Sequence, residues 1–285
     1  MLEMLMNPTK AERKPWEMFF VGVFYASLSI LLVTWIFGKD PVLSRYSGIL
    51  VVTFTVMFSL PFMYYIIKLE ERKITSQIKT LSLLQEHEKA IKAMMWLFIG
   101  FVVAFSFWYI VLPNSDNFRA QIETYCSINQ PGNVENCVSQ YGVKNSVRGT
   151  GFITNQERLF LIFSNNMYVL MFTLIFSLIF GAGAIFILAW NASVIAAAIK
   201  IFTQSSLTAL PLGLLRYLIH GIPEIAAYFV VALAGGIVSV AVIRKEYRSE
   251  KFWDIMQDAL NLVIIAVVLL FVAALIEVYV TPVLF

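Results

Sequence analysis

Six polar or ionisable side chains lie in or beside long apolar runs in the second half of the chain. They are two glutamates, one histidine and three asparagines: Asn165, Asn166, Asn191, His220, Glu224 and Glu277. A carboxylate inside a membrane helix costs roughly 2.5–3.5 kcal/mol on insertion scales, so it normally faces a partner or a cavity. Such groups either form a proton or substrate site or bond neighbouring helices to one another. We therefore treat them as the candidate functional residues.

The composition identifies the elements that must position these residues. Hydrophobic residues make up 59% of the chain and charged residues 14%, and the mean hydropathy is +0.77. A soluble domain is nearer 45–50% apolar and about 25% charged. We therefore expect an all-α, polytopic bundle of transmembrane helices whose first partner is the lipid bilayer. The net charge of +3 is small and comes from the loops, so we expect no nucleic-acid partner.

Apolar runs of about 20 residues, the length that spans a bilayer, identify six helices directly. They cover residues 17–37, 47–67, 93–112, 166–190, 222–243 and 257–280. The interval 191–221 contains two shorter apolar pieces, Ala192–Phe202 and Leu207–Ile219, which carry Lys200 and Arg216 and are interrupted by Pro211 and Gly213. Each piece is too short to span alone, so the interval is either one broken crossing or a re-entrant pair.

The placement of basic residues favours the broken crossing. Lys and Arg number three in 1–16, six in 68–92 and four in 244–251, against two in 38–46 and four in the long segment 113–164. The positive-inside rule then places the N-terminus, 68–92 and 244–251 in the cytoplasm. Residues 190 and 244 share a side only if the chain crosses twice between them. We predict about seven crossings, the fifth one broken, with the N-terminus inside and the C-terminus outside; six crossings with a re-entrant pair is the alternative.

Two loop segments carry further expectations. Cys126 and Cys137 both fall in the external segment 113–164, where an oxidising compartment favours a disulfide; two free thiols are the alternative. Residues 68–92 repeat apolar side chains near a helical period. We interpret this segment as an amphipathic linker packed on the cytoplasmic side, with partner binding as the alternative.

The predicted topology brings most of the polar groups to one depth. Asn165, Asn166, His220, Glu224 and Glu277 fall near the outer ends of three helices, whereas Asn191 falls at the inner end of the fourth. Several of them also have a local explanation. Asn165 could cap a helix, the pair Pro223-Glu224 is typical of a helix start, and the Glu277 side chain could extend to the membrane–water interface. Their shared depth supports a polar cluster instead. The chain contains no metal, cofactor or catalytic motif, so we expect no metal, no cofactor and no enzyme.

Small residues indicate where helices approach closely. The three sites are Gly181-Ala182-Gly183, Ala196–Ala198 and Ala232-x-x-x-Gly236. We assign most of them to packing within the chain and leave a homodimer open.

Four strings in the same half resemble the stage II sporulation protein M family. They are Phe163-Ser164-Asn165-Asn166, Asn191-Ala192-Ser193, His220-Gly221-Ile222-Pro223-Glu224-Ile225 and Ala274-Leu275-Ile276-Glu277-Val278-Tyr279-Val280-Thr281-Pro282. The resemblance covers residues 93–285, a core of five crossings. Residues 1–92, with two helices and the amphipathic segment, resemble the extension of archaeal members, as does His87-Glu88-Lys89-Ala90-Ile91. Ala192 departs from the pattern, which usually has Gly there.

In spore-forming bacteria the resemblance implies a membrane scaffold that recruits cell-wall-degrading enzymes to the engulfing septum. What transfers to an archaeal-type chain is a non-enzymatic core in the cell membrane that assembles other membrane proteins. The alternative is a transporter or channel, in which the broken helix and the Glu, His and Asn groups form a substrate or proton site. A water-filled cavity lined by the glutamates favours transport, and internal pairing of the polar groups favours a scaffold.

Overall fold

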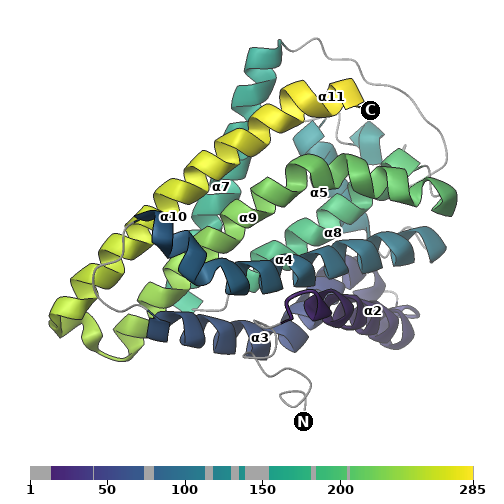
Figure 1. Cartoon of the computed structure of the whole chain (residues 1–285). Helices are drawn as coiled ribbons and strands as arrows, with labels where there is room; N and C mark the ends of the chain where they lie inside the picture. The colour runs from purple at the N-terminus through teal and green to yellow at the C-terminus, as the bar shows by residue number, and fades with distance from the viewer. Residues whose placement is uncertain are drawn as a thin grey trace.

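The computed structural model describes residues 14–40, 42–73, 80–112, 118–129, 135–138, 154–180, 184–203 and 206–284. The regular elements in this described part are all helical (Figure 1). The long helices are α2 (Glu17–Phe37), α3 (Ser47–Lys73), α4 (Thr80–Val111), α5 (Arg119–Asn129), α7 (Asn155–Phe180), α8 (Ala184–Thr203), α9 (Leu210–Ile243) and α10 (Glu250–Leu275). Shorter pieces are η2 (Leu43–Tyr46), η4 (Leu207–Ala209), η5 (Glu246–Arg248), the π-helical turn η6 (Ile276–Val280) and α11 (Thr281–Leu284).

Seven helical segments have the length and apolar composition needed to cross a membrane. They are Glu17–Phe37, Leu43–Ile67, His87–Val111, Asn155–Ile179, Ala184–Thr203, Leu207–Ile243 and Phe252–Leu284. The predicted all-α, multi-pass membrane protein with seven spans is confirmed.

Helix α9 is the central element of the bundle. It packs against α10, α7, α8, α4 and α3, and its span has the largest buried share of the seven. Two glycines in its second half let other helices approach closely. A Cβ on Gly235 would lie 2.8 Å from the Ser177 Cβ of α7, and one on Gly236 would lie 2.9 Å from the Ile67 Cδ1 of α3. The Ser177 hydroxyl donates a hydrogen bond to the Ala232 carbonyl across the same contact.

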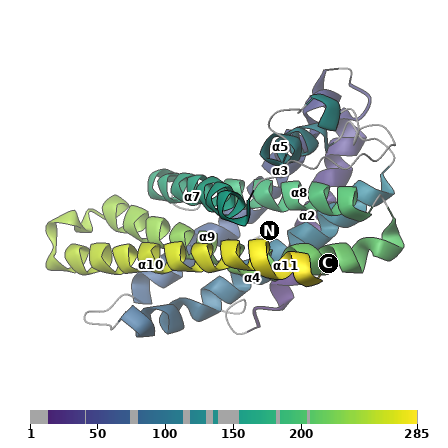
Figure 2. The same cartoon turned by 90° about the horizontal axis from the view of Figure 1, so that it is seen from above.

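Helix α2 joins the bundle through a second glycine contact. A Cβ on Gly100 of α4 would lie 2.9 Å from the Val23 backbone nitrogen and 3.0 Å from the Gly22 Cα of α2. Further along the same pair of helices, the Trp108 indole donates to the Ser27 hydroxyl at 2.9 Å. Residues 17–37 are therefore packed directly on the region 93–285. Figure 1 shows α2 and α4 near each other in the lower part of the molecule, and in Figure 2, seen from above, α10 and α11 lie in front.

The turn between α2 and α3 is fixed by one aspartate. Asp40 Oδ1 accepts hydrogen bonds from the backbone N–H groups of Val42 and Leu43, each at 2.8 Å. These bonds favour the carboxylate and hold the pKa of Asp40 below its ordinary value. The same bonds start the 3-10 turn η2, from which α3 continues.

The predicted break in the fifth crossing is wrong. Ala192–Phe202 lies inside the uninterrupted helix α8, whereas Leu207–Ile219 begins with η4 and continues into α9. Pro211 occupies the first turn of α9, where a missing N–H leaves no hydrogen bond unmade. The proline therefore begins a helix instead of interrupting one. The fourth and sixth helices consequently begin at Asn155 and Leu210, not at 166 and 222.

A capping box explains the early start of α7. The Thr154 backbone N–H donates to Glu157 Oε2 at 2.9 Å, and the Glu157 N–H donates to Thr154 Oγ1 at 3.3 Å. This reciprocal pairing satisfies two N–H groups that a helix start leaves without partners. Because the first turns of α7 are polar, a search for apolar runs alone places the boundary too late.

Several predicted features lie outside the described residues. They include Ile74 and Ile78 of the amphipathic segment, the Gly181-Ala182-Gly183 string, and residues 113–117, 130–134 and 139–153 of the predicted external segment. The other two small-residue sites are described. Residues Ala196–Ala198 and Ala232–Gly236 are buried within the chain.

Candidate polar site between α7, α9 and the end of α10

Glu224 on α9 is the acceptor of a short hydrogen-bonded series. The Tyr228 hydroxyl, one turn further along α9, donates to Glu224 Oε1 at 2.9 Å, and the Asn166 side chain of α7 also hydrogen-bonds to Glu224. Asn165 Nδ2 donates to Asn166 Oδ1 at 3.3 Å, which leaves the Asn166 amide N–H groups for the carboxylate. Two adjacent asparagines and a tyrosine therefore hold one glutamate between two helices.

A second pairing joins α9 to the C-terminal end of the chain. His220 Nδ1 lies 3.3 Å from the Thr281 Oγ1 of α11, and Thr281 also donates to the Ile276 carbonyl at 3.2 Å. A hydroxyl has one proton to donate, so a hydrogen bond with His220 requires the histidine to carry its proton on Nδ1. This contact links the middle of α9 to the last turns of the chain.

Glu277 lies in the π-helical turn Ile276–Val280 between α10 and α11. Its carboxylate is attracted by the Arg158 guanidinium of α7. The same carboxylate disfavours negative charge on Glu224 and Tyr228 of α9. A π turn is rare and recurs at functional positions in helices. Here it carries one of the two carboxylates of the cluster.

Two arginines supply positive charge near this group. Arg158 of α7 and Arg216 of α9 both interact electrostatically with His220. The Arg216 guanidinium also lies 4.7 Å from the centre of the Phe202 ring, a cation–π contact between α9 and α8. The cluster thus contains two carboxylates and has two guanidinium groups near it.

The cluster residues lie inside their helices, not at the helix ends predicted from sequence. Asn165 follows the first residue of α7 by ten positions, and Glu224 follows the first residue of α9 by fourteen. Neither residue caps a helix. Pro223 also lies inside α9. Membrane helices tolerate a proline when neighbouring groups bond to the backbone carbonyl that the proline leaves without a donor.

Asn191 lies apart from the cluster. It lies in the middle of α8 and not at the inner end of the fourth helix, and its Nδ2 donates to the Ile187 carbonyl one turn earlier at 2.8 Å. The next residue, Ala192, stands where the family pattern usually has Gly, and it is fully buried. A methyl group is therefore accommodated at this position.

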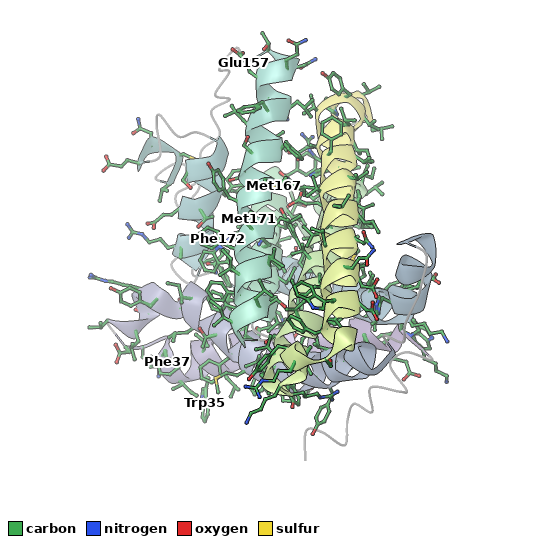
Figure 3. The ribbon with its side chains drawn as sticks, turned by 90° about the vertical axis from the view of Figure 1, so that its left-hand side faces the viewer. Trp35, Phe37, Glu157, Met167, Met171 and Phe172 are labelled. Carbon is green, nitrogen blue, oxygen red and sulfur yellow. A yellow bond between two sulfur atoms is a disulfide. The ribbon has the colours of Figure 1, made fainter. Side chains whose placement is uncertain are left out.

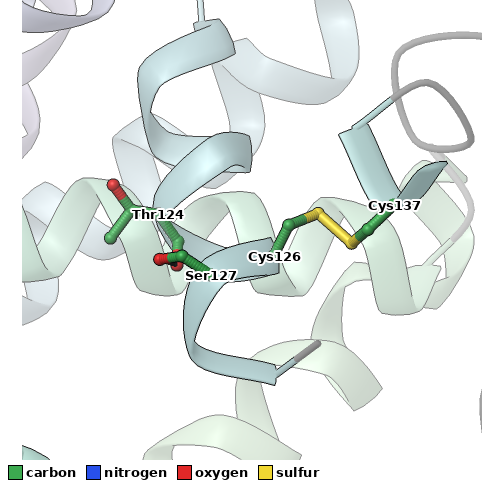
Figure 4. Close-up of a disulfide and its surroundings, with 4 residues drawn as sticks. All are labelled: Thr124, Cys126, Ser127 and Cys137. Atoms are coloured by element: carbon green, nitrogen blue, oxygen red, sulfur yellow. Dashed lines mark hydrogen bonds between the residues drawn. A yellow bond between two sulfur atoms is a disulfide. The ribbon is translucent and has the colours of Figure 1, made fainter. Parts of the chain in front are cut away.

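Cys126 and Cys137 form a disulfide (Figure 4), with their Cα atoms 5.8 Å apart. Both cysteines are buried. The helix α5 that carries Cys126 is attached to α3, because Gln121 Nε2 donates to the Gly48 carbonyl at 2.9 Å. Tyr125 of α5 hydrogen-bonds to Tyr217 of α9, so the helix that carries Cys126 contacts the same helix as the polar cluster.

Four contributors to the site were missed by sequence reasoning: Arg158, Tyr228, Thr281 and Tyr217, whose ring centre lies 6.1 Å from that of His220. Tyr228 follows Glu224 by four residues, the spacing of helix neighbours, and this signal was available. The other three depend on how α5, α7, α9 and α11 are placed in space. Within the described part of the chain, no three His, Cys, Asp or Glu side chains gather closely enough to hold a metal ion.

The opposite face of α7 carries exposed apolar side chains. In Figure 3, Met171 and Phe172 lie along the helix below Glu157, and Trp35 and Phe37 lie near the other end of the molecule. Met171 and Phe172 are about half exposed, and the α7 span has the smallest buried share of the seven. Lipid is the solvent such a face requires.

Comparison with known proteins places the candidate site within the part of the chain that a family model matches. The model described as stage II sporulation protein M matches residues 93–282, which is 190 of the 285 residues. An uncharacterized protein of Methanocaldococcus jannaschii is 35% identical over 127 residues, covering 42% of this chain and 69% of that protein. No solved structure matches the chain.

Proposed function

This chain belongs to the stage II sporulation protein M family, and on that premise we propose that it is a non-enzymatic scaffold or assembly factor. It holds partner membrane proteins together in the cell membrane, with its N-terminus in the cytoplasm and its C-terminus outside. The seven spans and the family match identify a multi-pass membrane protein of this family. The scaffold role is the further step.

The observation that carries the proposal is the hydrogen bonding of Glu224 and His220 to other side chains of the same chain. Tyr228 and Asn166 bond to Glu224, and Thr281 bonds to His220. A solute site directs donors and acceptors at the solute, whereas these groups are directed at one another across α7, α9 and α11. Interhelical hydrogen bonds of this kind average about 0.6 kcal/mol each in a membrane protein. Hydrogen bonds that join helices in this way support a scaffold role.

The transporter alternative loses one of its two supports. It required a broken fifth helix beside ionisable groups, the arrangement by which secondary transporters build substrate sites. Helices α8 and α9 are each continuous over their described lengths. We therefore do not propose transport.

The buried small-residue sites restrict where partners bind. Ala196–Ala198 and the Ala232–Gly236 site face other helices of the same chain, so they support neither a homodimer nor a partner contact. The remaining surfaces are the exposed helix faces, of which α7 offers the largest share, and the disulfide-closed segment around α5. We assign partner binding to these surfaces.

Affinity purification from native membranes in a mild detergent tests the proposal. We expect the wild-type chain to recover at least one membrane protein at near-stoichiometric amount. Glu224→Leu leaves buried partners unsatisfied and is expected to reduce that recovery, whereas Asp254→Asn, at an exposed position, should not. Recovery of no stoichiometric protein by the wild type would contradict the scaffold role.

A further inference from the structure

The turn between α9 and α10 gathers exposed basic and aromatic residues between two membrane spans. Residues 244–251 contain four basic and two acidic residues. Lys245, Arg248 and Tyr247 are exposed, and the Arg248 guanidinium lies 5.6 Å from the centre of the Tyr247 ring. The turn projects at the lower left of Figure 1, at one end of the long α9–α10 pair.

Apolar residues on either side place this turn at a membrane surface. Ile243 at the end of α9 is 73% exposed and Trp253 near the start of α10 is 74% exposed. Both belong to, or directly adjoin, helices that are long and apolar enough to span a bilayer. Tryptophan and tyrosine concentrate at the level of lipid headgroups. The basic side chains of the turn therefore lie at headgroup depth.

Lys245 has a backbone conformation that a lysine rarely adopts. Its φ of 60° is the only positive value at a non-glycine residue in the described part of the chain. It follows directly after the C-cap Arg244, and its N–H donates to the Val242 carbonyl at 2.9 Å. Glycine is the usual residue at this position of a helix end because the left-handed conformation strains any other side chain except, to a lesser degree, asparagine. Strained backbone conformations of this kind cluster at functional positions in proteins.

Local stabilisation of the helix is the competing explanation for Lys245. A cation at the C-terminal end of a helix interacts favourably with the exposed carbonyl groups. Arg244 already supplies a cation at that end, however, and glycine would satisfy the backbone without strain. The lysine is thus best explained by what its side chain binds outside the chain.

We propose that the α9–α10 turn is a binding site for the phosphate headgroup of an anionic phospholipid, with Lys245 and Arg248 as the residues that contact it. Clusters of basic residues at the end of a membrane helix attract anionic lipids in this way. The exposed Trp253 anchors the turn at the bilayer surface. The inference is independent of the scaffold role, because lipid binding at this turn requires no protein partner.

The test measures thermal unfolding of the purified full-length chain in a neutral detergent, with added phosphatidylglycerol or phosphatidylcholine. For the wild type, phosphatidylglycerol is expected to raise the unfolding temperature more than phosphatidylcholine does. Lys245→Gly relieves the backbone strain, so its unfolding temperature without lipid should equal or exceed that of the wild type. Its response to phosphatidylglycerol should nevertheless fall by at least half, and Arg248→Gln should lose the response similarly.

Lys39→Gly provides the matched control. Lys39 is an exposed lysine in another interhelical turn, and its backbone is not left-handed. This variant should keep the full difference between the two lipids. A full phosphatidylglycerol response in Lys245→Gly would overturn the proposal. So would a lower unfolding temperature of Lys245→Gly in detergent alone, because it would show that the lysine serves the helix end.

Discussion

At the scale of single residues, the contribution of the polar cluster to the free energy of unfolding depends on whether residue 224 can accept hydrogen bonds. A carboxylate that accepts bonds from Tyr228 and Asn166 is expensive to replace by an apolar group, because both donors stay buried and lose their acceptor. The cost of one unsatisfied buried group is about 1–3 kcal/mol. An amide of nearly the same shape keeps one acceptor oxygen for them. Comparing a glutamine with a leucine at residue 224 therefore separates the effect of losing the charge from the effect of losing the hydrogen bonds.

We expect Glu224→Gln to lower the free energy of unfolding by less than about 1 kcal/mol and Glu224→Leu to lower it by about 1–3 kcal/mol. Unfolding in detergent, followed by circular dichroism, measures both. Adding Tyr228→Phe to Glu224→Leu removes one stranded donor, so the double variant should lose less than the sum of the two single changes. Equal losses for Gln and Leu would mean that the hydrogen bonds contribute nothing.

At the scale of helices, packing distances and caps decide what the apolar pattern leaves open. The periodic apolar runs were sufficient to identify most helices, but the pattern placed the starts of the fourth and sixth helices 11 and 12 residues late. The Thr154–Glu157 capping box and Pro211 near the helix start were readable signals for both starts. Contacts such as Gly100 against Val23 were not, because helix order in the chain does not determine which faces meet.

Two glycines of α9 should respond to alanine in opposite directions. At Gly235 the added Cβ would lie 2.8 Å from Ser177 and 3.0 Å from the Leu174 carbonyl oxygen, whereas at Gly221 it would meet nothing within 4 Å. Gly235→Ala should lose about 1–3 kcal/mol through overpacking, and Gly221→Ala should gain about 0.5–1 kcal/mol through helix propensity. Denaturant unfolding of both variants measures the pair, and a stabilising Gly235→Ala would contradict the close α7–α9 contact.

The disulfide should resist alkylation until it is reduced. Cys126 and Cys137 are bonded and buried, so intact-mass measurement after iodoacetamide treatment without reductant should show neither thiol modified. Replacing both cysteines with serine should lower the free energy of unfolding by about 2–3 kcal/mol, since the disulfide restricts the unfolded chain and the short loop that it closes keeps this effect modest. Alkylation of both residues before reduction would disprove the pairing.

At the scale of the whole molecule, the sequence specified the class and the number of spans but not the arrangement. High hydropathy and the charge of the loops were sufficient for an all-α membrane protein with seven spans, because each span must satisfy that constraint by itself. The candidate residues could be selected from the sequence, since ionisable groups are conspicuous among apolar ones. The shared depth of the polar groups predicted that Glu224 would lie within hydrogen-bonding reach of His220, Glu277 or an asparagine of the fourth helix, and the structure has Asn166 there. The contact between His220 and Thr281 was not predictable, because it depends on the register between helices distant in sequence.

The orientation of the chain is expected to follow its basic loops. Ser249→Cys, in the basic turn before α10, should resist an impermeant thiol reagent in intact cells. Ser146→Cys, in the predicted external segment and outside the described residues, should be labelled. The native disulfide leaves the background unreactive. Labelling at 249 with protection at 146 would invert the proposed topology.

The central claim is that the polar cluster joins helices to one another and does not line a solute path. Its most direct test is the reactivity of Glu224→Cys toward a small, charged, membrane-impermeant thiol reagent in native membranes. An internally paired core surrounded by lipid excludes such a reagent, so we expect no modification until the protein is denatured and rapid modification afterwards. Modification of the native protein at a rate near that of Ser146→Cys, which we expect to be labelled from outside, would show water at Glu224 and contradict the scaffold role.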